Sequence, residues 1–180
     1  MSPTLNKDEI IQQLNAVASE FSSYCATIDD PNFFQQPAGK WSIAQNVEHL
    51  VKSADSTRLA YALPKFIVRL YVGKPNRPSR SFDELLAKYN HKLEQGGKAS
   101  GRFIPKDIKS NQAKQTLLKQ YSHSMARLIN AIQSKWKDSQ LDNYLCPHPL
   151  LGKITLRELG YFTIFHTTHH LNTIKIRRTS

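Results

Sequence analysis

The stretch FHTTHHLNTIKIRR, from Phe165 to Arg178, carries three histidines within five residues. His166 and His170 are four residues apart, so on an α-helix their imidazoles share one face and can bind a single divalent ion. HExxH zinc sites use this spacing, although here Thr167 stands where that motif has glutamate. The alternative is a pair of buried histidines satisfied by hydrogen bonds. The pair is therefore a fragment of a metal site and not a protease signature.

Helical geometry places both histidines on the inward face of their segment. With His166 at 0° and about 100° per residue, His170 lies at about 40°, Leu159 at about 20° and Thr173 at about 340°. His169 points about 60° to one side, where it lies either behind the ligands or at the surface. It is the weaker candidate of the three.

A third ligand has to come from another helix, and His49 is the candidate. It lies about 150° from the centre of the apolar stripe of its segment, so periodicity alone would turn it toward solvent. Its neighbours on that side, however, are small and mostly uncharged: Asn46, Ser53, Ser56 and Ala60. Charged residues form a separate stripe. A helix with these three faces suits the lining of an interior polar cavity.

Two long amphipathic helices are predicted in the first third of the chain. The first is capped by Thr4, carries apolar residues three and four positions apart, and ends before Asp29. The second begins after the cap residue Ser42, ends near Pro64 and carries His49. Residues 64–80 are too broken by Pro and Gly for a long helix.

Two more long helices are expected in the second half. One runs from about Ile108 to Trp136, and the other begins at Thr155 and ends near Ile176. Glu158, three residues after Thr155, completes a capping box. A short helix opens after Ser81, whereas residues 95–106 and 141–153 are expected to be loops, and the first of these loops matches no phosphate-binding motif.

Four long helices without a convincing strand pattern predict an all-α four-helix bundle, with residues 1–180 as one domain. The connections of about 15 to 45 residues are long enough to cover one end of such a bundle as a pocket wall. No run approaches the roughly 20 apolar residues of a spanning helix, and no export signal is recognised, so a cytoplasmic protein without a membrane partner is expected. Cys25 and Cys146 lack CxxC spacing and are expected to be reduced and structural.

The net charge of +11 is concentrated in the later part of the chain. Residues 1–60 carry 4 Lys and Arg against 7 Asp and Glu, whereas residues 61–180 carry 21 against 7. This balance suits simple solubility, a nucleic acid or an anionic cosubstrate. Nucleic acid is disfavoured because no recognition helix or stacking motif is present. Four arginines are candidates for attracting an anion: Arg69, Arg77, Arg80 and Arg102.

Two stretches together resemble the DinB-like superfamily, of the DinB and YfiT type. They are KWSIAQNVEHL, with Trp41 and His49, and HPLLGKITLRELGYFTIFHTTHHLNTIK, which spans residues 148–175. The resemblance covers nearly the whole chain. It implies a four-helix bundle with a divalent metal, zinc or nickel, held by three histidines, which in this sequence are His49, His166 and His170.

The resemblance also suggests His148, in the HPLLG turn, as a pocket residue. Helical geometry adds Asn46 and Ser53, which share the small polar face with His49, and His169 as a candidate behind the ligands. Many relatives have Gln where this chain has Thr173, so the polar contacts of the pocket are expected to differ.

The chemistry expected of such a site depends on its nucleophile. Metal-assisted hydrolysis normally uses a carboxylate as general base, and neither Glu48 nor Glu158 has a spacing that gives it that role; a cap or surface position is expected for both. A metal-bound thiol needs no such base. Members of the superfamily with assigned activity largely use low-molecular-weight thiols. The expectation is therefore a thiol S-transferase acting on a small molecule, with a metal-dependent hydrolase, and then a non-enzymatic or nucleic-acid-binding module, as alternatives.

A homodimer is also expected. Helix one and the stretch FIVRLY (residues 66–71) offer apolar surface for pairing, although nothing in the sequence fixes the symmetry.

Overall fold

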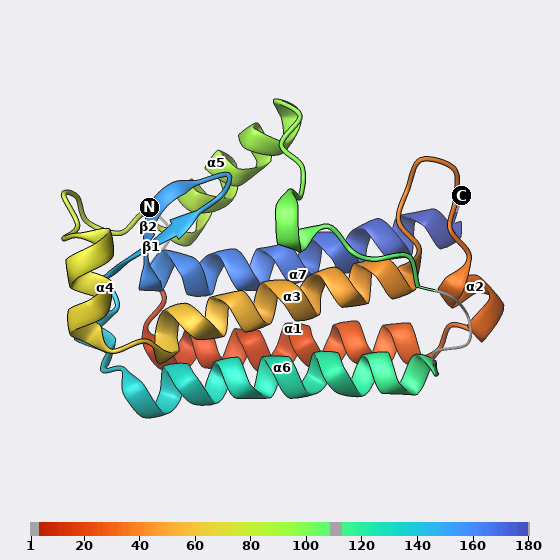
Figure 1. Cartoon of the computed structure of the whole chain (residues 1–180), viewed down its shortest axis with the longest axis horizontal. Coiled ribbons are helices and arrows are strands. Elements are labelled where there is room, and N and C mark those ends of the chain that lie inside the picture. The colour runs from red at the N-terminus through yellow and green to blue at the C-terminus, as the bar shows by residue number, and fades with distance from the viewer. Residues whose placement is uncertain (1–3, 109–112, 180) are drawn as a thin grey trace.

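The computed structural model describes residues 4–108 and 113–179. Four long helices form the bundle: α1 (Lys7–Ala26), α3 (Ile43–Ala62), α6 (Lys114–Lys135) and α7 (Leu156–Thr179). Each contacts two of the others, in the cyclic order α1, α6, α3, α7. Figure 1 shows α3 and α7 side by side on one face, with α1 and α6 beneath them. The predicted all-α four-helix bundle is confirmed.

The bundle does not alternate up and down. Figure 1 shows α3 and α6 running in the same direction, so the chain has to travel back along the bundle between them. This return uses α4 (Lys65–Val72), α5 (Phe82–Glu94) and the short 3-10 helix η1 (Gly101–Phe103). Residues 97–104 cross above α3 and α7, and we call them the roof segment.

Helix caps explain where two of the long helices begin. Ser42 caps α3, as predicted, and forms a capping box with Gln45. The prediction of Thr4 as the first cap is wrong, because Asn6 accepts hydrogen bonds from the backbone N–H groups of Asp8 and Glu9 and forms a capping box with Glu9.

Two further predictions on the later part of the chain need correction. Ile108 lies outside any helix and α6 begins at Lys114, while residues 109–112 lie outside the described part. The expected loop 141–153 contains an antiparallel hairpin, β1 (Leu145–His148) and β2 (Gly152–Thr155), preceded by the 3-10 helix η2 (Asp138–Gln140). Gly152 opens β2 with φ 75°, a backbone conformation that favours glycine.

The start of α7 is held by a buried carboxylate. Glu158 is fully buried and forms the predicted capping box with Thr155, accepting from its backbone N–H at 2.9 Å. Arg77 donates to it at 2.7 Å and Arg80 at 3.3 Å. The expected surface position of Glu158 is therefore wrong, and the cap is confirmed. Arg77 and Arg80 form ion pairs with this carboxylate and do not line the cavity described below.

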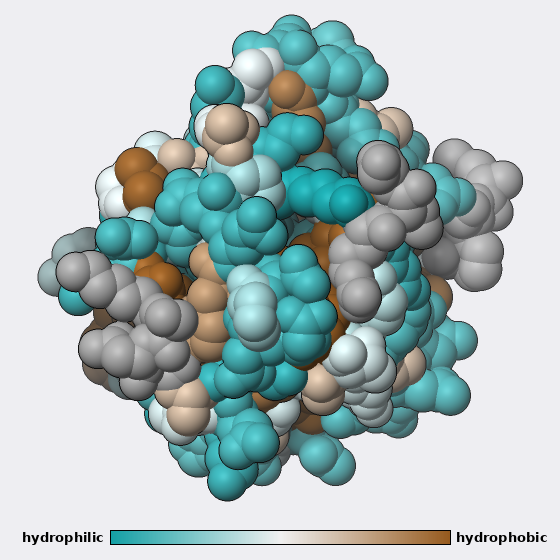
Figure 2. Space-filling model, turned by 90° about the vertical axis from the view of Figure 1, so that its right-hand side faces the viewer, coloured by the Kyte–Doolittle hydropathy of each residue, from teal (hydrophilic) through white to brown (hydrophobic). Residues whose placement is uncertain are grey.

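The two ends of the molecule differ in exposed apolar surface. Figure 2 faces the end near α2 (Asp30–Phe34) and shows a mostly hydrophilic surface. At the other end, α4 exposes Phe66, Leu70 and Tyr71, within the stretch predicted to be apolar surface. The apolar positions of α1, in contrast, are buried in the core, so the prediction that helix one offers a pairing surface is wrong. None of the described helices is long and apolar enough to span a bilayer.

Candidate metal centre

Three histidines from two helices converge beneath the roof segment. His49 comes from α3, and His166 and His170 come from α7. The Nε2 atom of His166 lies 3.1 Å from Nε2 of His49 and 3.2 Å from Nε2 of His170. One ring nitrogen from each residue lies within 4.8 Å of the others, and all three side chains are buried. The structure therefore brings together the three residues that the sequence singled out.

Two of the three imidazoles, those of His49 and His170, are oriented by a close partner on the far nitrogen. Nδ1 of His49 donates to the carbonyl oxygen of Phe103 at 2.7 Å, and Nδ1 of His170 donates to Oδ1 of Asn46 at 2.6 Å. The amide nitrogen of Asn46 donates to the Ser42 carbonyl, which fixes the side chain with its oxygen toward His170. Histidines that bind metals are generally held in this way.

The count of protons favours a cation among the three rings. Because Nδ1 carries the proton in His49 and in His170, Nε2 is a bare lone pair in both neutral rings. His166 can direct at most one Nε2 proton at its two neighbours, so at least one of the contacts at 3.1 and 3.2 Å joins two lone pairs. A positive ion between the nitrogens removes this repulsion.

The spacing of the nitrogens also fits a divalent ion. Nitrogen ligands about 2.0–2.1 Å from zinc are about 3.3 Å apart in tetrahedral geometry and about 2.9 Å apart in octahedral geometry. The two contacts made by His166, at 3.1 and 3.2 Å, fall between these values, and all three ligand nitrogens lie within 4.8 Å of one another. The donor set therefore fits zinc, nickel or a similar ion.

The histidines are kept neutral by their surroundings. Burial lowers the pKa of His49 below its ordinary value of 6.5, and burial together with the neighbouring imidazoles lowers the pKa of His166 and of His170 well below it. Neutral imidazole is the form that binds metals. The site is thus ready to take up an ion without first losing protons.

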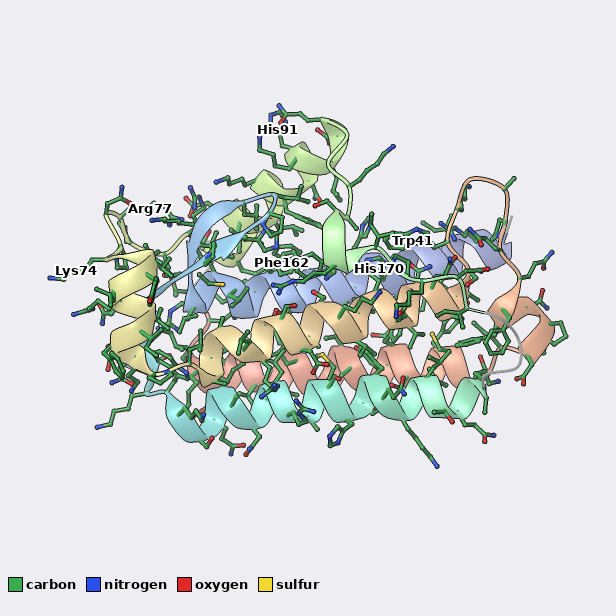
Figure 3. The ribbon with its side chains drawn as sticks, in the orientation of Figure 1. Trp41, Lys74, Arg77, His91, Phe162 and His170 are labelled. Atoms are coloured by element: carbon green, nitrogen blue, oxygen red, sulfur yellow. The ribbon has the colours of Figure 1, made fainter. Side chains whose placement is uncertain are left out.

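A long cavity opens above the three histidines. Its volume is about 1110 Å³, and its floor follows one face of α3 from Asn46 to Leu63 and one face of α7 from Leu159 to Arg177. Trp41 lies beside the histidines, with its ring stacked parallel to that of His170 at 6.3 Å (Figure 3). Residues of the roof segment, among them Phe103 and Ile104, also line the cavity.

The charged side chains among the described lining residues of the cavity are all cationic. Four cationic residues line it: Lys40, Lys98, Arg102 and Arg177. Within the described part of the chain no Asp or Glu does. Glu48, one of the two carboxylates considered from the sequence, instead accepts from the backbone N–H of Lys106 and pairs with Lys52. Of the four arginines predicted to attract an anion, only Arg102 lines the cavity; Arg69 lies over the ring of Tyr144.

The remaining predicted pocket residues all line the cavity, in different roles. Asn46 orients His170, whereas Ser53 contacts Nδ1 of His166 at a longer distance of 3.4 Å. His169 and Thr173 line the wall, and Thr173 donates to the carbonyl oxygen of His169. His148 lines the cavity from the hairpin, against Phe162.

Sequence reasoning missed the carbonyl group of Phe103, which orients His49. Every residue has a backbone carbonyl, so residue types cannot show which one will accept a hydrogen bond. Residues 95–106 also match no motif with a known chemistry. The one available signal was their Gly-rich composition, because glycines allow a segment to lie close to other backbone.

Solved structures share this fold. YfiT from Bacillus subtilis, described as a probable metal-dependent hydrolase with an unusual four-helix bundle topology, matches with a TM-score of 0.58 and 20% identity over 96% of this chain and 87% of its own. The colibactin self-resistance protein ClbS, solved with double-stranded DNA, matches at 0.57 and 15% over 100% and 99%. The mycothiol-dependent maleylpyruvate isomerase matches at 0.54 and 15% over 96% and 62%.

Identities of 20% or less show a shared fold and no more. None of the proteins of curated function is similar enough in sequence to count as a relative. The family model described as the DinB superfamily, however, matches residues 13–174, which include all three histidines. On this match the chain belongs to the DinB superfamily.

Proposed function

We propose that His49, His166 and His170 bind a divalent ion, zinc or nickel, and that the protein joins a small electrophilic substrate to an anionic low-molecular-weight thiol. The observation that carries the proposal is the make-up of the cavity: three neutral imidazoles directed at one point, and no carboxylate among the described lining residues. Three neutral ligands leave an ion its full charge and an open position.

The absence of a carboxylate from the described lining residues favours thiol transfer over hydrolysis. Metal-assisted hydrolysis normally needs a general base beside the bound water. A bound divalent ion would itself lower the pKa of a thiol and so supply the thiolate. In the transfer, the thiol loses its proton to solvent water, its sulfur forms a bond to the electrophilic carbon, and the displaced group leaves with the electron pair of its former bond.

The chain's own residues hold the reactants. Arg177 donates to the carbonyl oxygen of Trp41 at 2.8 Å, so its guanidinium is fixed at one end of the cavity next to the exposed Lys40. Arg102 and Lys98 add positive charge from the roof segment. These groups favour a cosubstrate with carboxylate or phosphate groups. Trp41 packs against His49 with ring centroids 5.0 Å apart, and the three histidines are 5–8% exposed.

Metal content of untagged protein is the first test. Wild-type protein should contain about one ion per chain, and the double variant His166→Ala, His170→Ala should contain almost none. His169→Ala is the matched control, because it removes a neighbouring histidine and should leave the ion in place. A protein that takes up no ion after reconstitution with zinc or nickel would overturn the proposal.

Turnover with defined thiols is the second test. Metal-loaded protein would be mixed with a chromogenic electrophile and either glutathione, which is anionic, or 2-mercaptoethanol, which is neutral. Arg177→Gln should raise KM for glutathione and leave KM for 2-mercaptoethanol unchanged. Hydrolysis of chromogenic esters without any thiol would instead favour the metal-dependent hydrolase.

The other predicted partners have separate tests. A homodimer formed through Phe66, Leu70 and Tyr71 of α4 would appear as twice the chain mass in sedimentation equilibrium and would be lost in a Leu70→Glu variant. Binding to bulk DNA that weakens steeply with added salt would favour the nucleic-acid alternative.

A further inference from the structure

His148 is held in one tautomer by the hairpin turn. Its Nδ1 accepts hydrogen bonds from the backbone N–H groups of Leu150 and Leu151, both at 3.2 Å. A nitrogen that accepts from two donors carries no proton, so in the neutral ring the proton is on Nε2. Burial lowers the pKa of His148 to about 4, and the ring is therefore neutral at physiological pH. His148 is a permanent hydrogen-bond donor through Nε2.

His148 is not one of the three candidate ligands. His148 lines the cavity, and its ring packs against Phe162 with centroids 4.2 Å apart. Phe162 in turn stacks on His166 with centroids 4.8 Å apart. One aromatic ring thus separates His148 from the nearest candidate ligand. No hydrogen bond from Nε2 of His148 is found among the described residues, and this nitrogen is not among their enclosed, unpartnered polar atoms.

The part of the cavity around His148 is apolar. We call it the apolar arm; it is lined by Leu59, Ala60, Leu63, Ile67, Leu145 and Leu150. It lies between α4, β1 and the beginning of α7, because β1 contacts both helices. Figure 3 shows Phe162 on this side of His170, with Trp41 on the other. The cationic end at Arg177 and the apolar arm therefore lie on opposite sides of the three histidines.

We propose that the apolar arm binds the electrophilic substrate, that this substrate is an uncharged apolar molecule with a carbonyl group beside its reactive carbon, and that Nε2–H of His148 donates to the carbonyl oxygen. The inference rests on the proposed function, because it names the class of its second reactant. An apolar wall with one fixed donor selects such a molecule. The same donor orients the carbonyl group while the sulfur bonds to the adjacent carbon and the displaced group leaves with its electron pair.

The test measures binding without turnover, so it does not depend on metal catalysis. The probes are the fluorescent ketone 6-propionyl-2-(dimethylamino)naphthalene and its analogue with a propyl group in place of the propionyl group. The ketone preference is the dissociation constant of the propyl analogue divided by that of the ketone. This preference should be about three- to tenfold larger in wild-type protein than in His148→Phe. His148→Gln, whose amide can both accept and donate, should restore part of the preference.

Control measurements isolate the contribution of the His148 side chain. The affinities are measured on protein as purified and after chelation, because a preference that disappears on chelation would mean that the ion, and not His148, holds the carbonyl. Phe66→Ser with Leu70→Ser removes exposed apolar surface outside the cavity and should leave both affinities unchanged. Thermal unfolding of each His148 variant verifies that the hairpin is intact.

Several results would overturn the inference. An equal ketone preference in wild-type, His148→Phe and His148→Gln proteins would mean that His148 only supports the turn. Failure of either probe to bind wild-type protein would refute an apolar substrate. If the probes behave as expected but no metal is bound, the proposed function fails while the carbonyl site stands.

Discussion

Replacing Asn46 is a direct test of how the candidate metal centre is organised. Asn46 is 2% exposed; its Oδ1 accepts from Nδ1 of His170 at 2.6 Å and its Nδ2 donates to the Ser42 carbonyl at 2.7 Å. In Asn46→Ala, His170 loses the acceptor that keeps the proton on Nδ1 and the lone pair of Nε2 directed at the other histidines. The variant leaves all three candidate ligands in place.

The size of the effect follows from the contact. Removing the outer partner of a metal-binding histidine typically weakens metal affinity by about 10- to 100-fold, or about 1.4–2.8 kcal/mol. We expect Asn46→Ala to fall in this range because its contact is short and buried. Ser53 lies 3.4 Å from Nδ1 of His166, a weaker contact, so Ser53→Ala should weaken affinity by less than about threefold. Asn46→Asp keeps an acceptor and should stay near wild type or bind more tightly.

Competition with a chromogenic zinc indicator would measure these affinities. Because Asn46→Ala also loses the bond to Ser42, urea unfolding of the metal-free variants must show that each is folded under assay conditions. Equal affinities for wild type and Asn46→Ala, or equal losses for Asn46→Ala and Ser53→Ala, would refute the assigned role of Asn46.

Three further predictions concern stability. Burial raises the pKa of Glu158, but the hydrogen bonds from Arg77 and from backbone N–H groups outweigh this effect. The pKa therefore lies below its ordinary value of 4.5. The contribution of ionised Glu158 to stability is therefore full above about pH 4.5 and is lost as the pH falls through the lower pKa of the folded state. Glu158→Gln should lower the free energy of unfolding in urea by about 2–3 kcal/mol at pH 7 and by progressively less in acid. A difference that stays constant with pH would contradict this. In Gly160→Ala the new Cβ would lie 2.9 Å from Cγ2 of the buried Ile10, so we expect a net loss of about 1 kcal/mol in urea unfolding, where an unhindered helix position would gain about as much. Zinc at about 100 times its dissociation constant should add about 2.7 kcal/mol of stability, seen as a rise of about 5–10 °C in melting temperature that a chelator reverses and that the double histidine variant lacks.

The predictable parts of the fold are those set by local patterns. The cap residue Ser42 and the spacing of Thr155 and Glu158 predict helix starts. Ser42 caps α3 as expected, in a capping box with Gln45 that was not predicted, and Glu158 forms the expected capping box with Thr155. The pattern Asn6 to Glu9 fits the same rule, with asparagine in place of Ser or Thr, and choosing Thr4 overlooked it. The hairpin was missed because it has only four residues per strand and a proline in β1, so it shows no alternating pattern.

The site was predictable only in part, because its residues meet through tertiary structure. The spacing of His166 and His170 fixes a shared helix face, and this holds for any α-helix. His49 is different, because periodicity turned it away from the core. It is nevertheless buried, since the roof segment lies over the small polar face of α3 and the Phe103 carbonyl oxygen accepts a hydrogen bond from its Nδ1. The small polar face of this helix predicted a cavity lining, and the family resemblance added the metal pocket, but neither identified the residues that cover His49.

The order of the chain delays the assembly of this site. His49 and His166 are 117 positions apart in sequence, and the Phe103 carbonyl comes from the return segment between them. During synthesis α7 follows every other element of the bundle, so the metal-binding arrangement does not exist until α7 has been made and has docked. A growing chain therefore presents His49 as an isolated histidine, which holds metals weakly. The topology therefore makes uptake of the proposed ion a late step, which only a folded chain can complete.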